Sequence, residues 1–182
     1  GGTNFEYNQY DHVNKNTKRQ VGSTFKPLIY TLAIKEKGYS PCFEVPDMPV
    51  CFEPDDARWP IQKRYCPENS DGKSSGMMAI KDGLAGSKNQ VTAYLMHELS
   101  AQAVVEFAHK MGIESEIPPY PSICLGVADI SVYEMIRAYT TFANKGTSNE
   151  PVFVSRIEDS HGNVTEEFFA ESTPALDEET AY

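Results

Sequence analysis

Apolar residues recur with helical spacing in several parts of the chain. In the segment from Ser23 to Lys37 they fall at positions 25, 28, 29, 32 and 33, on one face of a helix that Gly38 ends. The same spacing predicts helices over residues 77–84, 89–99, 101–111 and 131–143. Ser131, followed three residues later by Glu134, is typical of a capping box at the start of the last of these helices.

The periodicity changes after residue 150. Apolar runs at 152–157 and 164–169 flank a turn-forming segment at 159–163, and this pattern predicts a β-hairpin. Residues 39–76 hold six prolines and three of the four cysteines, so we expect a long loop with short strands around Val50-Cys51-Phe52. Residues 1–20 are polar and are expected to form an extended lead-in, and residues 177–180 begin a further helix.

Composition and charge argue against nucleic-acid binding and against a membrane-spanning helix. The chain has 182 residues, 40% hydrophobic and 23% charged, which is typical of a folded domain. Its net charge of -10 disfavours binding to nucleic acids, because an acidic surface repels phosphate. No run approaches the roughly 18 apolar residues that a membrane-spanning helix requires. The chain opens without an initiator Met or a signal peptide, so we expect a fragment or a processed segment.

The four cysteines do not indicate a metal or another cofactor. No C-x-x-C pair occurs and no histidine lies near the cluster, which makes a zinc site a weak interpretation. In an oxidising compartment, one disulfide among Cys42, Cys51 and Cys66 competes with free thiols, and the sequence leaves this choice open. Cys124 lies in an apolar run and is expected to be a packed thiol.

Ser23 and Lys26 form an S-x-x-K pair, the first candidate for catalysis. Residues three apart share a helix face, so the Lys26 amine would lie beside the Ser23 hydroxyl. A lysine with a lowered pKa can act as the base that a serine nucleophile needs. Pro27 lacks the N–H that would bond the Ser23 carbonyl, so Ser23 should begin the helix. For a bare match, the competing interpretation is a capping serine with a solvated lysine.

Ser87 and Asn89 form a second candidate pair, two residues apart between predicted helices. Their side chains point the same way only if the segment is extended, so we expect a loop there. The Ser87 hydroxyl could then relay a proton to a leaving amine, while the Asn89 amide holds a substrate carbonyl and the catalytic lysine. The alternative is that either residue simply caps the helix that follows.

With both pairs in this order, the sequence resembles the transpeptidase domain of class A (bifunctional) penicillin-binding proteins. The stretch from Arg19 to Tyr30, RQVGSTFKPLIY, looks like the active-site segment of that family. Similar segments follow in the same order along nearly the whole chain: Trp59-Pro60 to Pro67-Glu68-Asn69, Gly83 to Asn89, Leu125-Gly126, Ile130-Ser131 and Ala138 to Gly146.

The resemblance implies a fold, a reaction and a location. The fold would be α+β, penicillin-binding/β-lactamase-like, with residues 1–182 forming a partial transpeptidase domain: mainly the helical lobe plus a C-terminal β-hairpin. The function would be D,D-transpeptidation of peptidoglycan stem peptides, with β-lactams as inhibitors and no cofactor. Ser23 would be the acylated nucleophile, Lys26 its base, and Ser87 and Asn89 the proton-relaying and substrate-binding second motif. The site would face the periplasm, and a membrane anchor and a glycosyltransferase domain would belong to a longer parent chain.

The sequence departs from the family in one motif. No Lys-Thr-Gly or Lys-Ser-Gly occurs, although the family places K-[ST]-G on a strand beyond the last helix. That strand would anchor the substrate carboxylate and supply one N–H of the oxyanion hole, so weak activity is expected of these residues alone. Two alternatives stay open: a β-lactamase-like hydrolase, against which stands the absence of an E-x-x-L-N segment after Ser87, and a non-catalytic penicillin-binding sensor.

Overall fold

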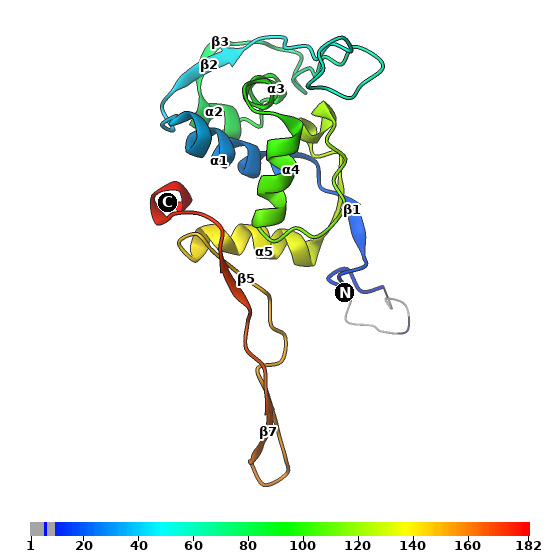
Figure 1. Ribbon diagram of the computed structural model, residues 1–182, viewed down its shortest axis with the longest axis vertical. Coiled ribbons are helices and arrows are strands. Elements are labelled where there is room, and N and C mark those ends of the chain that lie inside the picture. Colours follow the sequence, from blue (N-terminus) through cyan, green and yellow to red (C-terminus); the bar gives the residue numbers. More distant parts are fainter. Residues whose placement is uncertain (1–5, 7–9) are drawn as a thin grey trace. The chain divides into compact units, whose positions relative to one another are not determined.

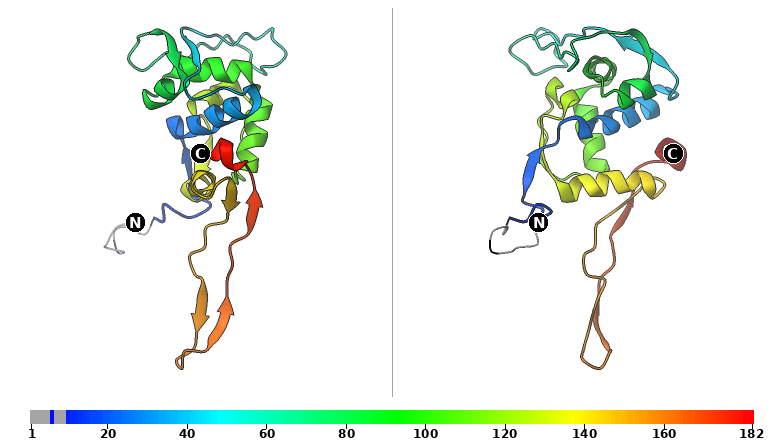
Figure 2. Two further views of the ribbon diagram at one scale, coloured as in Figure 1. Left: turned by 90° about the vertical axis from the view of Figure 1, so that its left-hand side faces the viewer. Right: turned by 180° about the vertical axis from the view of Figure 1, so that it is seen from behind.

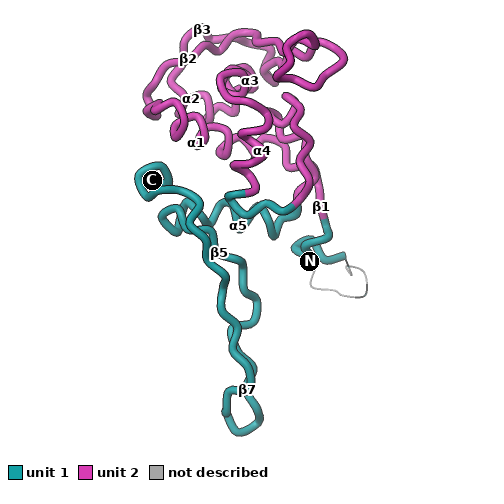
Figure 3. Tube along the Cα trace, in the orientation of Figure 1, with its two compact units in different colours: residues 1–17, 110–114, 131–182 teal, residues 18–109, 115–130 magenta. Residues whose placement is uncertain are grey.

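A computed structural model of the chain describes residue 6 and residues 10–182. Residues 1–5 and 7–9 of the predicted lead-in over residues 1–20 therefore lie outside the described residues. The chain divides into two compact units, which Figure 3 colours separately. Unit 1 consists of residues 1–17, 110–114 and 131–182, and unit 2 of residues 18–109 and 115–130.

Unit 2 holds most of the helices, and α1 packs against α3 at its centre (Figure 1). Its buried apolar side chains include Leu28 and Ile29 from α1, Val91 and Leu95 from α3, and Ile123 from η2. Its elements, in chain order, are β1 (Lys18–Gln20), the 3₁₀ turn η1 (Gly22–Phe25), α1 (Lys26–Lys37), β2 (Glu44–Asp47), β3 (Gly76–Ala79), α2 (Ile80–Ala85), α3 (Asn89–Glu98), α4 (Ala101–Lys110), the 3₁₀ turn η2 (Pro121–Leu125) and β4 (Asp129–Ser131). The last residues of α4 and β4 belong to unit 1.

The first α-helix begins three residues later than the sequence predicts. Ser23 lies in the 3₁₀ turn η1, and α1 starts at Lys26. Because Pro27 has no N–H to donate, the Ser23 carbonyl accepts its bond from the N–H of Lys26 instead. Ser23 therefore still occupies a helical turn, directly before the α-helix.

The predicted helix over residues 77–84 is wrong in its first part. Met77 and Met78 lie in β3, which pairs antiparallel with β2 so that Met78 faces Val45. The helix α2 begins only at Ile80. Pairing with a strand about thirty residues earlier has overridden the local helical pattern, as tertiary contacts often do. The expected strands around Val50-Cys51-Phe52 reduce to one isolated bridge between Phe52 and Tyr65.

A disulfide joins Cys51 to Cys66 and closes part of the long loop. Within that loop Trp59 packs edge-on against Phe52, with ring centroids 4.8 Å apart, and both rings are buried. Cys42 is a free, exposed thiol and Cys124 is a free, buried one. The choice that the sequence left open is thus settled in favour of one disulfide, and the packed thiol at Cys124 is confirmed.

Unit 1 is built from a capped helix and a long hairpin. Ser131 and Glu134 form the predicted capping box, each side chain accepting from the backbone N–H of the other residue. The predicted hairpin is confirmed, and Figure 2 shows it as one extended ribbon in which β6 pairs with β7 and β5 with β8. The elements are α5 (Val132–Ala143), β5 (Thr147–Asn149), β6 (Arg156–Glu158), β7 (Val164–Glu167), β8 (Ser172–Pro174) and α6 (Glu178–Ala181). None of the helices among the described residues has the length and apolar character needed to span a membrane.

Candidate active site

The turn that carries Ser23 is held by close backbone contact with the end of η2. The N–H of Gly22 donates to the carbonyl of Gly126 at 3.0 Å, and both glycines have positive φ, +57° and +70°. A Cβ on Gly126 would lie 1.9 Å from the carbonyl oxygen of Gly22, so only glycine permits this approach. The side chain of Ser23 is exposed at this turn.

Lys26 is the buried centre of the site. Only 1% of this residue is exposed, although it carries an amine. Its Nζ donates to the Ser87 carbonyl at 2.6 Å, to Ser87 Oγ at 3.1 Å and to Asn89 Oδ1 at 2.7 Å. Three acceptors match the three donors of an ammonium group. The two sequence motifs therefore meet at one nitrogen atom.

Burial lowers the pKa of Lys26 from its ordinary value of 10.5 to about 8. Desolvation penalises the charged ammonium, and the opposing effect of the nearby Cys124 thiol is smaller. An amine with this pKa is neutral in a sizeable fraction of molecules near neutral pH, which is the state that a general base requires.

Ser87 reaches Lys26 through an unusual backbone conformation. It lies between α2 and α3 with φ of +50°, a left-handed geometry that costs free energy for a residue other than glycine. Both its carbonyl and its hydroxyl consequently accept from Lys26. Residue 88, not Ser87 or Asn89, is the N-cap of α3, and it makes no side-chain capping bond. The expected loop is confirmed, and the alternative of simple capping residues is not what the structure shows.

Of the four predicted site residues, Lys26, Ser87 and Asn89 are joined directly by hydrogen bonds. Ser23 stands in the turn immediately before Lys26, with the Lys26 N–H bonded to its carbonyl. Among the described contacts, no hydrogen bond links the Ser23 hydroxyl to the Lys26 amine. The structure thus assembles the lysine with the second motif and leaves the serine hydroxyl exposed at the surface.

Two further side chains, Cys124 and Tyr65, were not predicted as part of the site, and of these Cys124 lies near Lys26. Cys124, on η2, interacts electrostatically with Lys26 and with Tyr65, and burial raises the pKa of its thiol to about 12. Burial likewise raises the pKa of Tyr65 above its usual range. Both groups are therefore neutral near pH 7, and the neutral Cys124 thiol adds to the low polarity around the amine. The apolar run around Cys124 predicted its burial, but no local pattern predicted its position near Lys26.

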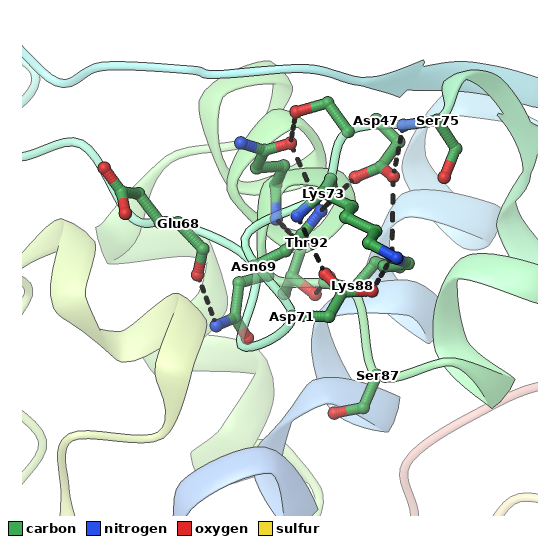
Figure 4. Close-up of polar contacts among 12 residues, drawn as sticks. Asp47, Glu68, Asn69, Asp71, Lys73, Ser75, Ser87, Lys88 and Thr92 are labelled. Atoms are coloured by element: carbon green, nitrogen blue, oxygen red, sulfur yellow. Dashed lines mark hydrogen bonds and ion pairs between the residues drawn. The ribbon is translucent and has the colours of Figure 1, made fainter.

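A second polar network, also missed from the sequence, lies around the segment from Ser87 to Gln90 (Figure 4). Asn89 donates through Nδ2 to the carbonyl of Glu68 at 2.7 Å, and the N–H of Gln90 donates to Asn69 Oδ1 at 3.0 Å. Asn69 in turn donates to the carboxylate of Asp47 at 2.7 Å. The Pro67-Glu68-Asn69 segment carried part of the family resemblance, which was the available signal.

The described side chains contain no group of three or more His, Cys, Asp or Glu residues arranged to hold a metal ion. What they do provide is a hydroxyl on a helical turn, a buried amine on the residue three positions later, and a second hydroxyl and an amide that are hydrogen-bonded to that amine. This set of groups suits nucleophilic acyl transfer by serine with a lysine base.

Comparison with known proteins points to one family. The family model described as the penicillin-binding protein transpeptidase domain matches residues 3–179. The chain is 31% identical over 174 residues to penicillin-binding protein 1A of Vibrio cholerae, covering 94% of the chain and 20% of that protein. It is 30% identical over 183 residues to penicillin-binding protein 2D of Bacillus subtilis, covering all of the chain and 26% of that protein.

Solved structures give the same result. Penicillin-binding protein 1A from Haemophilus influenzae matches with a TM-score of 0.80 and 27% identity, over 92% of this chain and 24% of that one. The PonA1 protein of Mycobacterium tuberculosis in complex with penicillin V matches with a TM-score of 0.75 and 25% identity, over 96% and 47% of the two chains. These likenesses confirm the expected α+β transpeptidase fold. The chain spans about a fifth to a quarter of the length of the curated relatives named above.

Proposed function

Because the chain belongs to the penicillin-binding protein transpeptidase domain family, we propose that it is part of a D,D-transpeptidase that cross-links peptidoglycan stem peptides through an acyl-enzyme on Ser23. Lys26 is the base in this proposal, and Ser87 and Asn89 serve both catalysis and substrate binding. We further propose that the site works on the periplasmic face of the cytoplasmic membrane, with residues 1–182 forming one part of the transpeptidase domain. No cofactor takes part.

The convergence on Lys26 is the observation that carries the proposal. A solvated lysine near Ser23 would be protonated and would have no role as a base, whereas Lys26 is buried and its pKa is lowered to about 8. Its three hydrogen bonds all lead to Ser87 and Asn89, sixty-one and sixty-three residues away in sequence. A chance S-x-x-K pair would not be expected to meet a second motif in this way.

The proposed reaction has two steps, acylation of Ser23 and transfer of the acyl group to an amine. In the first, Ser23 Oγ attacks the carbonyl carbon between the two terminal D-alanines while its proton passes to Lys26 Nζ. The C–N bond then breaks, and the proton moves through Ser87 Oγ to the departing D-alanine amine. In the second, the amine of another stem peptide attacks the carbonyl carbon of the Ser23 ester. A new amide bond forms as the ester C–O bond breaks, and the proton lost by the attacking amine passes to Ser23 Oγ.

A β-lactam would follow the first step only. Attack by Ser23 opens the lactam C–N bond, but the leaving nitrogen stays attached to the acyl group and is not released. The product is a stable ester on Ser23, so inhibitor and substrate test the same residue. The bound penicillin V of the PonA1 structure is consistent with this reaction class in a relative.

The test is peptide mapping by mass spectrometry after exposure of the intact protein to a labelled penicillin. The sequence of residues 1–182 holds no K-[ST]-G motif, so the intact natural protein is the appropriate sample. We expect a stoichiometric adduct on Ser23 in the wild type and none in Ser23→Ala. Rapid hydrolysis of nitrocefin with no lasting adduct would favour a β-lactamase, and normal cross-linking by Ser23→Ala would favour a sensor.

A further inference from the structure

We propose that Asn69, held by the buried Asp47, is a positioning residue that orients the Asn89 amide toward Lys26. This inference rests on the proposed function, because it concerns the same acyl-transfer site. Neither Asn69 nor Asp47 is hydrogen-bonded to Lys26, whose amine bonds to Ser87 and Asn89. Both act through the segment that carries Ser87 and Asn89, which Figure 4 shows lying against them.

Glu68 and Asn69, from the long loop, bond to Asn89 and Gln90, the first two residues of α3. Asn89 Nδ2 donates to the Glu68 carbonyl at 2.7 Å, and the Gln90 N–H donates to Asn69 Oδ1 at 3.0 Å. The second bond also uses an N–H at the start of α3 that has no partner within the helix. The loop thereby binds the amide nitrogen of Asn89, while the amide oxygen of the same side chain accepts from Lys26.

The Glu68 carbonyl fixes the orientation of the Asn89 amide. Its NH₂ group is occupied by the Glu68 carbonyl, which leaves Oδ1 to accept from Lys26 Nζ at 2.7 Å. With the amide reversed, two donors would face the ammonium and two carbonyl oxygens would face each other. The position of the Glu68 carbonyl therefore decides whether Asn89 accepts from the catalytic amine.

Buried polar contacts with Asp47 hold the loop itself. Asn69 is 5% exposed and Asp47, at the end of β2, is 0% exposed. Asn69 Nδ2 donates to Asp47 Oδ1 and to the Lys73 carbonyl, both at 2.7 Å, and Asp47 Oδ2 accepts from the Ser75 N–H at 2.9 Å. Buried polar groups satisfied in this way are rigid and are costly to leave without a partner. Asp47 thus ties residues 69–75 to the strand β2.

Lys88 balances the buried charge of Asp47. Its Nζ lies 3.9 Å from Asp47 Oδ2 and 2.8 Å from Asp71 Oδ2. The Asp71 side chain is 52% exposed, so its attraction to Lys88 is screened by water, whereas the carboxylate of Asp47 is not. Lys88 lies between Ser87 and Asn89 in the sequence. Asp47 therefore supports this segment in two ways, through its hydrogen bond with Asn69 and through its ion pair with Lys88.

The experiment compares Asn69→Ala and Asp47→Asn with wild type in the intact protein. Acylation by a fluorescent penicillin is followed by stopped flow, and the rate constant at saturation is separated from the apparent Kd of the penicillin. Each rate constant is expressed per titratable site, below the unfolding temperature of the variant. Asp71→Asn is the matched control, because it removes the exposed carboxylate that contacts the same Lys88.

We expect Asn69→Ala and Asp47→Asn to lower the saturating acylation rate constant by about 10- to 100-fold, as misplacement of a catalytic group typically does. The apparent Kd should change by less than about threefold, and Asp71→Asn should stay within about twofold of wild type in both quantities. A purely structural role would reduce only the titratable fraction, and a wild-type rate constant per site in both variants would overturn the inference. If wild type itself forms no adduct, the proposed function has failed instead.

Discussion

The rate at which a penicillin acylates the intact protein should rise with pH through an inflection near pH 8, and Lys26 should set it. The neutral amine is the reactive form, and burial has lowered the pKa of Lys26 from 10.5 to about 8. Raising the pH through this value converts the ammonium to the amine, so the rate increases with pH and then levels.

The size of the effect follows from the pKa. At pH 7 an amine with a pKa of about 8 is neutral in roughly 10% of molecules, against roughly 0.03% at the ordinary value, a gain of about 300-fold. The acylation rate should therefore rise about tenfold between pH 7 and its plateau. Lys26→Met, which cannot accept a proton, should lose about 100- to 10,000-fold in rate at pH 8.

The assay is stopped-flow acylation by a fluorescent penicillin between pH 6 and 10.5, with the folded fraction checked by circular dichroism at each pH. Lys37→Met is the matched control, because Lys37 is exposed at the other end of α1. It should keep the wild-type profile. An inflection at or above pH 10, or a wild-type rate in Lys26→Met, would refute the assignment of Lys26 as the base.

Two further predictions concern the frame of the site. Gly126→Ala should lower both the Tm and the acylation rate, because the new Cβ would lie 1.9 Å from the Gly22 carbonyl oxygen. Gly162→Ala is the control, because Gly162 also has a positive φ but has open space around it. It should lower the free energy of unfolding by only about 1 to 2 kcal/mol and leave the acylation rate unchanged. Equal effects of the two substitutions on stability and acylation rate would contradict the claim that the contact with Gly22 requires glycine at position 126. Cys51→Ser breaks the disulfide, which closes a loop with a sequence separation of 15 residues, and should lower the free energy of unfolding by about 3 kcal/mol. Cys42→Ser, at the exposed free thiol, should change the free energy of unfolding little. Urea unfolding checks both, and an unchanged midpoint for Cys51→Ser would show that the disulfide does not stabilise the fold.

Elements determined by local patterns were predicted well from the sequence. The capping box at Ser131 and Glu134 depends on residues three apart, and the hairpin depends on alternation around one turn, so each is contained in a short stretch of chain. The bond between Asn89 and Lys26 was also anticipated, whereas the bonds from Lys26 to Ser87 and the left-handed φ at Ser87 were not.

What the sequence did not predict depends on contacts between distant residues. The strand β3 forms because Met77 and Met78 pair with β2. The apolar periodicity within residues 77–84 does not indicate that pairing, because the partner strand lies elsewhere in the sequence. The same holds for the bond between Asp47 and Asn69, twenty-two residues apart, and for the choice of Cys51 and Cys66 over Cys42. Such choices are made by packing and polar satisfaction in the folded chain.

The most direct test of the account is the site of covalent modification by penicillin. The intact protein is incubated with labelled penicillin, digested and mapped by mass spectrometry, beside its Ser23→Ala variant. The account predicts one adduct per chain within this domain, on Ser23, that disappears in the variant. An adduct on another residue, or one that persists in Ser23→Ala, would contradict the claim that Ser23 is the nucleophile.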